Sequence, residues 1–231
     1  VIGNAADIQK IHGQNRAYTR SVLGIPQDSL VFINVGSIDS RKNQLGLLKA
    51  FEIFNQTVDR ESYLIIAGNV LSEFYDDEVC KYVGMLTCKE HVIKLPHHKN
   101  IGDLYNAADI FVMPSYYEGW SIAATEALYC GIPLIHSYCG SAKELLDGGE
   151  NGILIGNPAG DIEKLDSEKL MAMMNGVNPA NIEELVSAMT QVASNREGWR
   201  KKRGEISERS ILNYSKNNMI NKYIEVFEKV L

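Results

Sequence analysis

Six short apolar segments recur along the chain, and most of them end at a glycine or a proline. Two of them, Leu30–Val35 and Tyr63–Ala67, are apolar runs interrupted only by Asn34, which is typical of strands buried on both faces of a parallel sheet. Segments with apolar residues at helical spacing, such as Gln44–Val58, separate them. Because strands that alternate with helices need crossover connections, this pattern predicts an α/β fold with a doubly wound parallel sheet of about six strands. The strands are expected at Leu30–Val35, Tyr63–Ala67, His91–Leu95, Asp109–Met113, Pro133–His136 and Gly152–Ile155.

The size of the chain suits one domain with a sizeable core, or a domain with a helical tail, since 45% of its 231 residues are hydrophobic. Beyond Asn157-Pro158 the pattern turns helical. We therefore expect one domain over residues 1–158 and a helical extension over residues 159–231 that packs on the same domain.

Composition excludes several classes of protein. No apolar run approaches the roughly 18 residues of a membrane span, and the start of the chain lacks a signal-peptide pattern, so a soluble, cytoplasmic protein is expected. The net charge of −6 argues against general nucleic-acid binding. An anionic ligand would need a local basic site. The cysteines show no Cys-x-x-Cys pair or metal spacing and are expected to be reduced structural thiols; they are Cys80, Cys88, Cys130 and Cys139.

The turn after the expected strand Asp109–Met113 is a candidate anion site. A helix, Ile122–Tyr129, begins shortly after Gly119. Its first backbone N–H groups, from about Trp120 to Ala123, have no partner inside the helix and carry a partial positive charge, so they can hold a phosphate. Gly119 would let a ligand approach the main chain closely.

Two carboxylates flank this turn, Glu118 before the helix and Glu126 just over one turn inside it. Helical side chains lean toward the N-terminus, so both can reach one ligand there. A carboxylate repels a phosphate and is better used to accept hydrogen bonds from sugar hydroxyls. This arrangement suits a nucleotide sugar. The alternative is that Glu118 only favours the helix dipole and Glu126 is a solvated helix residue.

These residues resemble the signature of retaining GT-B glycosyltransferases of family four, the group 1 transferases, in which seven residues separate two glutamates. The usual Glu-Gly-Phe-Gly-Leu is present as Glu118-Gly119-Trp120-Ser121-Ile122, and the similarity extends through residues 127–137. By this resemblance the first glutamate, Glu118, contacts the donor hexose. The second, Glu126, contacts the nucleotide ribose, and the backbone amides between them contact the hexose or the diphosphate. Ser121 stands where the family often has glycine.

The loop after the first strand is neither Gly-x-Gly-x-x-Gly nor a Walker A loop, which counts against NAD and ATP chemistry. By resemblance it is the Gly-Arg-x-x-x-x-Lys loop that binds the donor diphosphate. Gly36 and Lys42 match its ends, whereas Ser37 stands at the arginine position. Arg41 either supplies the missing charge or is a solvated loop residue. Its register alone does not decide between the two.

The resemblance places the base-binding contacts near the third strand, so Ile93 and Leu95 are expected to border the base. His97 and His98 follow that strand, but no carboxylate pair has metal-ligand spacing, and GT-B transferases generally need no metal. We expect no metal site and no cofactor.

The resemblance implies one Rossmann-like half of a GT-B fold, the half that binds the donor. Its donor would be a nucleoside-diphosphate sugar, expected to be a UDP-hexose, and its acceptor a glycan or a lipid-linked sugar held by an N-terminal domain absent from this chain. Val1–Asp7 is similar to the segment that leads into the second domain, so the chain alone is expected to be inactive. Basic residues within 196–203 either touch anionic lipid at the inner face of a membrane or form a solvated helix face.

Three alternatives remain open from the sequence. A GT-B nucleotide-sugar epimerase would share the fold but needs acid and base groups at the sugar ring. A non-catalytic module would keep nucleotide-sugar affinity alone. A generic flavodoxin-like partner domain would leave Glu118, Glu126 and Lys42 without a role.

Overall fold

The computed structural model of the chain describes residues 2–11, 13, 15–161, 166–174 and 179–230. Val1, Leu231 and parts of the expected extension at 162–165 and 175–178 lie outside these residues. Six parallel strands form one sheet in the order β3-β2-β1-β4-β5-β6, which confirms the predicted doubly wound, Rossmann-like fold. The strands are β1 (Leu30–Val35), β2 (Ser62–Ala67), β3 (Val92–Leu95), β4 (Ile110–Met113), β5 (Leu134–Ser137) and β6 (Gly152–Ile155).

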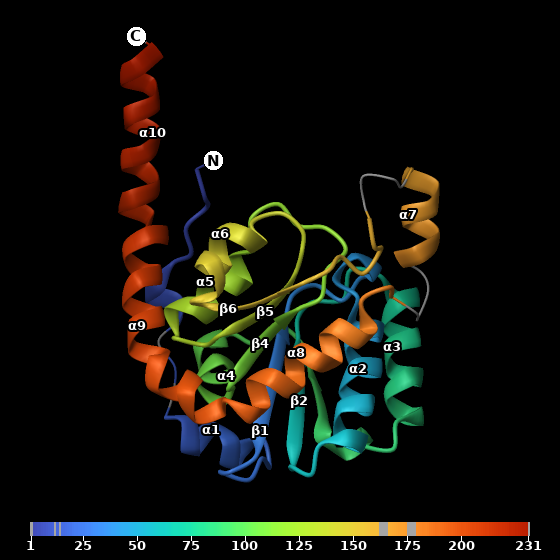
Figure 1. Cartoon of the computed structure of the whole chain (residues 1–231). Coiled ribbons are helices and arrows are strands. Elements are labelled where there is room, and N and C mark those ends of the chain that lie inside the picture. The colour runs from blue at the N-terminus through green and yellow to red at the C-terminus, as the bar shows by residue number, and fades with distance from the viewer. Residues whose placement is uncertain (1, 12, 14, 162–165, 175–178, 231) are drawn as a thin grey trace.

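Helices cover both faces of this sheet (Figure 1). One face carries α2 (Gln44–Thr57), α3 (Glu73–Met85) and α8 (Ile182–Ser194). The other carries α4 (Ile101–Ala107), α5 (Ile122–Tyr129), α6 (Ala142–Leu146) and α9 (Arg196–Tyr214), with α1 (Arg16–Val22) against α4. The remaining helices are α7 (Ser167–Met174) and α10 (Lys216–Val230), and short 3-10 turns occur at Ile8–Ile11, Ser40–Lys42, Lys89–His91 and Asp147–Gly149. Figure 1 shows α10 continuing from α9 away from the body of the molecule.

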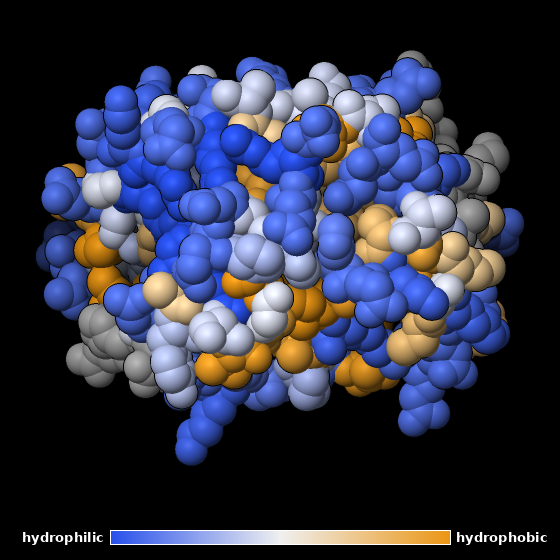
Figure 2. Space-filling view, turned by 90° about the horizontal axis from the view of Figure 1, so that it is seen from below, coloured by the Kyte–Doolittle hydropathy of each residue, from blue (hydrophilic) through white to orange (hydrophobic). Residues whose placement is uncertain are grey.

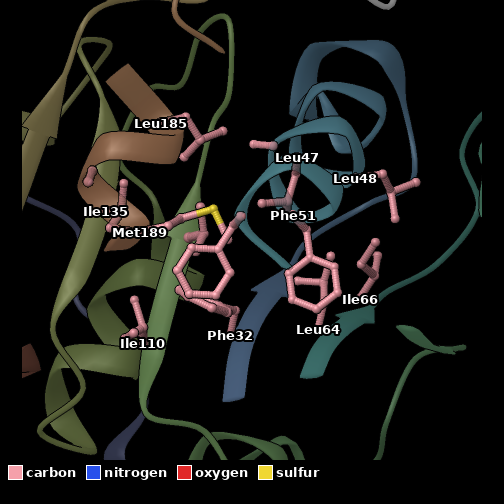
Figure 3. Close-up of a cluster of buried hydrophobic side chains, with 14 of the residues drawn as sticks. Phe32, Leu47, Leu48, Phe51, Leu64, Ile66, Ile110, Ile135, Leu185 and Met189 are labelled. Atoms are coloured by element: carbon pink, nitrogen blue, oxygen red, sulfur yellow. The ribbon is translucent and has the colours of Figure 1, made fainter. Parts of the chain in front are cut away.

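Each central strand feeds two hydrophobic cores because successive side chains point to opposite faces. On β1, Leu30 and Phe32 join the core under α2, α3 and α8, whereas Val31 and Ile33 join the core under α4, α5 and α9. Figure 3 shows the first core, in which the Phe32 ring lies near Phe51 of α2 and Met189 of α8. The helices that follow residue 159 thus contribute Leu185, Met189, Val192 and Ile206 to the two cores.

The amino end of the sheet is organised by one buried carboxylate, that of Asp109, which lies just before β4 rather than in the expected strand. Arg16, Arg20 and Arg196 form ion pairs with it at 2.6, 2.9 and 3.0 Å, and Arg200 lies at 3.6 Å. Burial raises the pKa of Asp109, but these cations outweigh burial and hold it below its ordinary value. Figure 2 shows this end of the molecule, where hydrophilic residues surround apolar patches.

The structure corrects both expectations for two of the basic residues of 196–203, Arg196 and Arg203, whereas Lys201 is exposed and Lys202 is half-exposed. Arg196 is 7% exposed, and it donates to the Asp28 and Ser29 carbonyls as well as to Asp109. Arg203 donates to the carbonyls of Ala108 and Cys130. Burial, the largest influence, lowers its pKa. These two arginines anchor α9 to the sheet, so they form neither a solvated face nor a lipid-binding surface.

Candidate functional site

The carboxyl ends of β1 and β4 meet where the strand order reverses, and open α/β sheets bind ligands at this position. The loop after β1 carries Lys42, and the loop after β4 carries Glu118. The Lys42 ammonium pairs with Oε1 of Glu118, and the two side chains are 18% and 11% exposed. Ser115 donates its hydroxyl to the same oxygen at 2.9 Å. Two predicted site residues from distant parts of the sequence therefore contact each other directly.

A buried histidine on the neighbouring strand lies within electrostatic range of this ion pair. His136 of β5 is fully buried, and its Nδ1 lies 2.8 Å from the carbonyl of Ser137. Within the described part of the chain, its Nε2 has no hydrogen-bond partner. Burial lowers the pKa of His136, while Glu118 and Lys42 act on it in opposite directions. Sequence reasoning treated His136 only as a strand residue.

The guanidinium of Arg41, the residue before Lys42, already has partners within its own loop and on the loop after β4. Its Nε and one terminal nitrogen bond the carboxylate of Asp39 at 3.0 and 3.1 Å, and its guanidinium lies 5.7 Å from the centre of the Tyr117 ring. Ser37, at the family's arginine position, donates its hydroxyl to Asp39 at 2.6 Å. Burial raises the pKa of Asp39, but the hydrogen bonds from Arg41 and Ser37 outweigh it and lower the pKa. The charge of Arg41 is thus largely balanced by Asp39.

Gly36 lies beside the aliphatic part of Lys42, because a Cβ built on it would be 3.6 Å from Lys42 Cε. Gly68, at the end of β2, has no room for a side chain, because a Cβ there would be 1.8 Å from the Gly36 carbonyl oxygen. The close approach of these two loops positions the start of the Lys42 loop.

The N-terminus of α5 matches the predicted turn with one difference. Ser121 caps the helix by accepting from the Ala124 amide at 3.2 Å, but its own amide donates to the Ser141 hydroxyl at 3.3 Å and is not available as expected. In the region that the structure describes, the amides of Ile122 and Ala123 have no partner. Gly119 faces open space, since nothing lies within 4 Å of a Cβ built there.

The indole of Trp120 packs away from the turn. Its ring centre is 5.5 Å from that of Tyr214 on α9, and it leaves no room for a side chain at Gly3. Its Nε1 donates to the Thr125 hydroxyl at 3.1 Å. The backbone of Trp120, rather than its side chain, is therefore placed to serve the site.

Glu126 lies in the second turn of α5, and the Tyr105 hydroxyl of α4 donates to its Oε2 at 3.0 Å. The same hydroxyl is 3.1 Å from the carbonyl of Ala123. Burial, reinforced by Glu126, raises the pKa of Tyr105 well above its ordinary value, so this phenol stays protonated and keeps donating. Glu118 and Glu126 are thus held by separate partners.

Ile93 and Leu95 lie on the outermost strand, β3, and are half-buried. The Leu95 carbonyl accepts from the Gly68 amide at 3.2 Å. The strand β2 separates them from the loop of Lys42, so the structure does not bring these two residues against the ion pair. Nearby, His98 lies 3.7 Å from Asp103. Across residues 2–230, wherever the structure describes them, no group of three or more His, Cys, Asp or Glu side chains is arranged to hold a metal ion.

Comparison with known proteins gives a consistent result. Residues 15–175 match the family described as glycosyl transferases group 1. Over 67% of the chain, 30% of residues are identical to the D-inositol 3-phosphate glycosyltransferase of Corynebacterium jeikeium, and 29% to the UDP-Gal:alpha-D-GlcNAc-diphosphoundecaprenol alpha-1,3-galactosyltransferase of Escherichia coli. The chain spans 39% and 40% of the length of these two relatives.

Solved structures share the fold at lower sequence identity. Anabaena HepE in complex with UDP superposes with a TM-score of 0.79 at 19% identity, over 99% of this chain and 57% of that one. The C-terminal domain of a group 1 glycosyl transferase, LpcC from Francisella tularensis, superposes with a TM-score of 0.67 at 17% identity, over 90% of this chain and 96% of that domain. In the part of the chain that the structure describes, no helix is both long and apolar enough to cross a membrane. By its sequence match, the chain belongs to the glycosyl transferases group 1 family.

Proposed function

We propose that this chain is the donor-binding half of a retaining glycosyltransferase. It would transfer a hexose from a nucleoside-diphosphate sugar, with UDP as the nucleotide, to a glycan or lipid-linked acceptor bound by an N-terminal domain of the longer protein. The donor domain is assigned to residues 1–158, and residues 159–231 to a helical extension of it. The observation that carries the proposal is the Lys42–Glu118 ion pair at the reversal point of the sheet, close to the N-terminus of α5.

The proposed donor lies along the carboxyl edge in a definite order. Its base borders Ile93 and Leu95 on β3, and its ribose reaches Glu126. Its diphosphate meets Lys42 and the free amides of α5, and its hexose meets Glu118. Gly36, Ser37, Gly119 and the backbone of residues 120–122 line the path. Arg41 contributes at the outer side of the diphosphate, restrained by Asp39.

Donor binding would exchange partners within the ion pair. Without a ligand, Lys42 neutralises Glu118. A diphosphate carries more negative charge than one carboxylate and would take over the ammonium of Lys42. Glu118 would then be free to accept hydrogen bonds from hexose hydroxyls. The diphosphate, by pairing with Lys42, would free Glu118 for the hexose, and the hexose, by binding Glu118, would free Lys42 for the diphosphate. The two parts of the donor would therefore be recognised together.

In the proposed reaction, the protein stabilises the charge of the leaving group and orients the donor. As the bond from the sugar to the diphosphate breaks, negative charge grows on the leaving group, and Lys42 with the amides of Ile122 and Ala123 would stabilise it. Glu118 and Glu126 would orient the hexose and the ribose for attack by an acceptor hydroxyl. They are not an acid and base pair of a glycosidase, because Glu126 is assigned to the ribose.

The comparisons support UDP as the nucleotide. The galactosyltransferase relative is named for a UDP-sugar donor and a diphosphoundecaprenol acceptor, and HepE has been solved with UDP and with UDP-glucose. A cytoplasmic location is supported by four unpaired cysteines, as expected in a reducing compartment.

Calorimetric titration of the 231-residue chain with UDP, GDP, ADP and uridine tests the proposal. We expect UDP to bind more tightly than the other nucleotides, and more tightly than uridine because of Lys42. Failure of every nucleoside diphosphate to bind would refute it.

A further inference from the structure

We propose that Tyr117 and Tyr138 form an aromatic platform that binds a pyranose ring of the acceptor on this half of the enzyme. The inference rests on the proposed function and adds a second ligand to it. Throughout, "the platform" means these two side chains.

Both rings are exposed at the carboxyl edge of the sheet. Tyr117 follows β4 and is 47% exposed, and Tyr138 follows β5 and is 46% exposed. Each of them adjoins a buried residue: Tyr116 is 1% exposed and Cys139 is 6% exposed. Since β4 and β5 are paired, with Met113 opposite His136, the two loops leave the sheet side by side.

Hydrogen bonds clamp these two loops together. The side-chain amide of the buried Asn157 donates to the Tyr116 carbonyl at 2.7 Å and to the Tyr138 carbonyl at 3.1 Å. The hydroxyl of Ser137 donates to the Ser115 carbonyl, which links the loops a second time. The backbones that carry the two rings are therefore fixed before any ligand arrives, which lowers the entropic cost of binding.

A cation lies over each ring. The guanidinium of Arg41 is 5.7 Å from the ring centre of Tyr117, and the ammonium of Lys143 is 4.7 Å from that of Tyr138. Such contacts restrain the rings by attraction to their π-electrons. Each cation covers one face, and each tyrosine is still nearly half exposed. A restrained, accessible aromatic face suits the C–H face of a sugar ring.

The position of the platform indicates the acceptor rather than the donor. Glu118 turns inward to Lys42 and is 11% exposed, whereas the adjacent Tyr117 turns outward to Arg41. The proposed path begins with the base at β3 and ends with the hexose at Glu118, in the loop after β4. Tyr117 directly precedes Glu118, and Tyr138 follows β5, which is paired with β4, so the platform borders the hexose end of this path. The sugar that accepts the hexose must bind at that end.

Saturation-transfer NMR with methyl α-D-glucopyranoside, methyl α-D-mannopyranoside and methyl α-D-galactopyranoside tests the platform, with and without saturating UDP. We expect transfer to the ring C–H protons of at least one glycoside. Tyr117→Ala and Tyr138→Ala should each reduce it about three- to tenfold, the range expected for loss of an aromatic contact. Tyr117→Phe and Tyr138→Phe should retain it, because stacking needs the ring and not the hydroxyl.

Tyr18→Ala is the matched control, since Tyr18 is 61% exposed but lies on α1. It should leave the transfer unchanged, and neither this control nor the Tyr138 variants should change UDP affinity more than about twofold. The platform would be overturned by the absence of transfer with the wild type, or by transfer in both alanine variants equal to that of the wild type. If UDP binds and transfer is absent, only the platform fails. If transfer depends on the two tyrosines but no nucleotide binds, the proposed function fails instead.

Discussion

The Lys42–Glu118 ion pair makes a prediction that runs against ordinary expectation for a binding residue. If bound diphosphate must take Lys42 away from Glu118, then removing the charge of Glu118 should strengthen UDP binding. Glu118→Gln keeps the size of the side chain and an oxygen that can accept the hydrogen bond of Ser115. It removes only the charge that competes with the phosphates.

The magnitude follows from the burial of the pair. A hydrogen bond between charged groups contributes about 1.5–3 kcal/mol when it is shielded from water, and exposed pairs contribute less. With Lys42 18% and Glu118 11% exposed, the lower end of that range applies. Every 1.4 kcal/mol corresponds to a tenfold change in affinity, so we expect UDP to bind about tenfold more tightly to Glu118→Gln.

The sugar nucleotide should behave differently from UDP. UDP-glucose would gain the same relief at the diphosphate but lose a charged acceptor for its hydroxyls. Its affinity relative to UDP should therefore fall in Glu118→Gln. Calorimetric titration of both ligands at one ionic strength measures this ratio. Glu73→Gln, at an exposed position in the first turn of α3, is the control for a change of net charge. Unchanged or weaker UDP binding by Glu118→Gln would refute the exchange of partners.

Four further substitutions test other parts of the molecule. Lys42→Ala should weaken UDP binding by about 1–3 kcal/mol and leave uridine binding nearly unchanged, and equal losses in calorimetry would contradict a role at the diphosphate. Glu126→Ala should weaken UDP and uridine alike by about 1–3 kcal/mol, and unchanged UDP affinity would defeat its assignment to the ribose. Asp109→Asn should lower the free energy of unfolding, measured in urea at neutral pH, by about 3–5 kcal/mol, because it leaves buried arginines without their anion. Burial raises the pKa of Asp109, but the arginines outweigh burial and lower this pKa below 3.8. The ionised carboxylate therefore stabilises the fold above pH 3.8, and this stabilisation is lost as the pH falls through the folded pKa. Asp109→Asn should lose this acid dependence. Gly140→Ala should lower the free energy of unfolding by about 1–3 kcal/mol in the same assay, because Gly140 has a φ of 50° and a Cβ there would lie 2.3 Å from the Gly119 carbonyl oxygen. An unchanged free energy of unfolding would show that the loop can shift to make room for the methyl group.

The sheet could be predicted from the sequence because its signals are local. Apolar runs such as Leu30–Val35 end at glycines, and the observed strands begin and end within one residue of the expected bounds. Asp109 was wrongly placed in a strand because it adjoins an apolar run. Its role depends on arginines 87 to 93 residues away, and nothing in the local pattern indicates them.

The site was predictable only in part. Its residue types followed from the turn before α5 and from the family resemblance, but the contact between Lys42 and Glu118 joins residues 76 positions apart and needs the strand order. Tyr105 and His136 carried no signal, since each reads as an ordinary core residue. Asp39 did carry one, because aspartate two residues before a backbone amide often accepts from it, as it does from Arg41 at 2.9 Å. The same carboxylate also accepts from the guanidinium of Arg41, so the charge of Arg41 is not free.

The carboxylate at the base of β4 also has a consequence for how the chain folds. It ties α1 to α9 through one point, so an early and a late segment of the polypeptide reach their final places together. Opening of α9 would leave a buried acid short of a partner and would loosen α1 as well. Amide hydrogen exchange should therefore report one cooperative unit at this end of the molecule, in which the two helices lose protection at the same denaturant concentration.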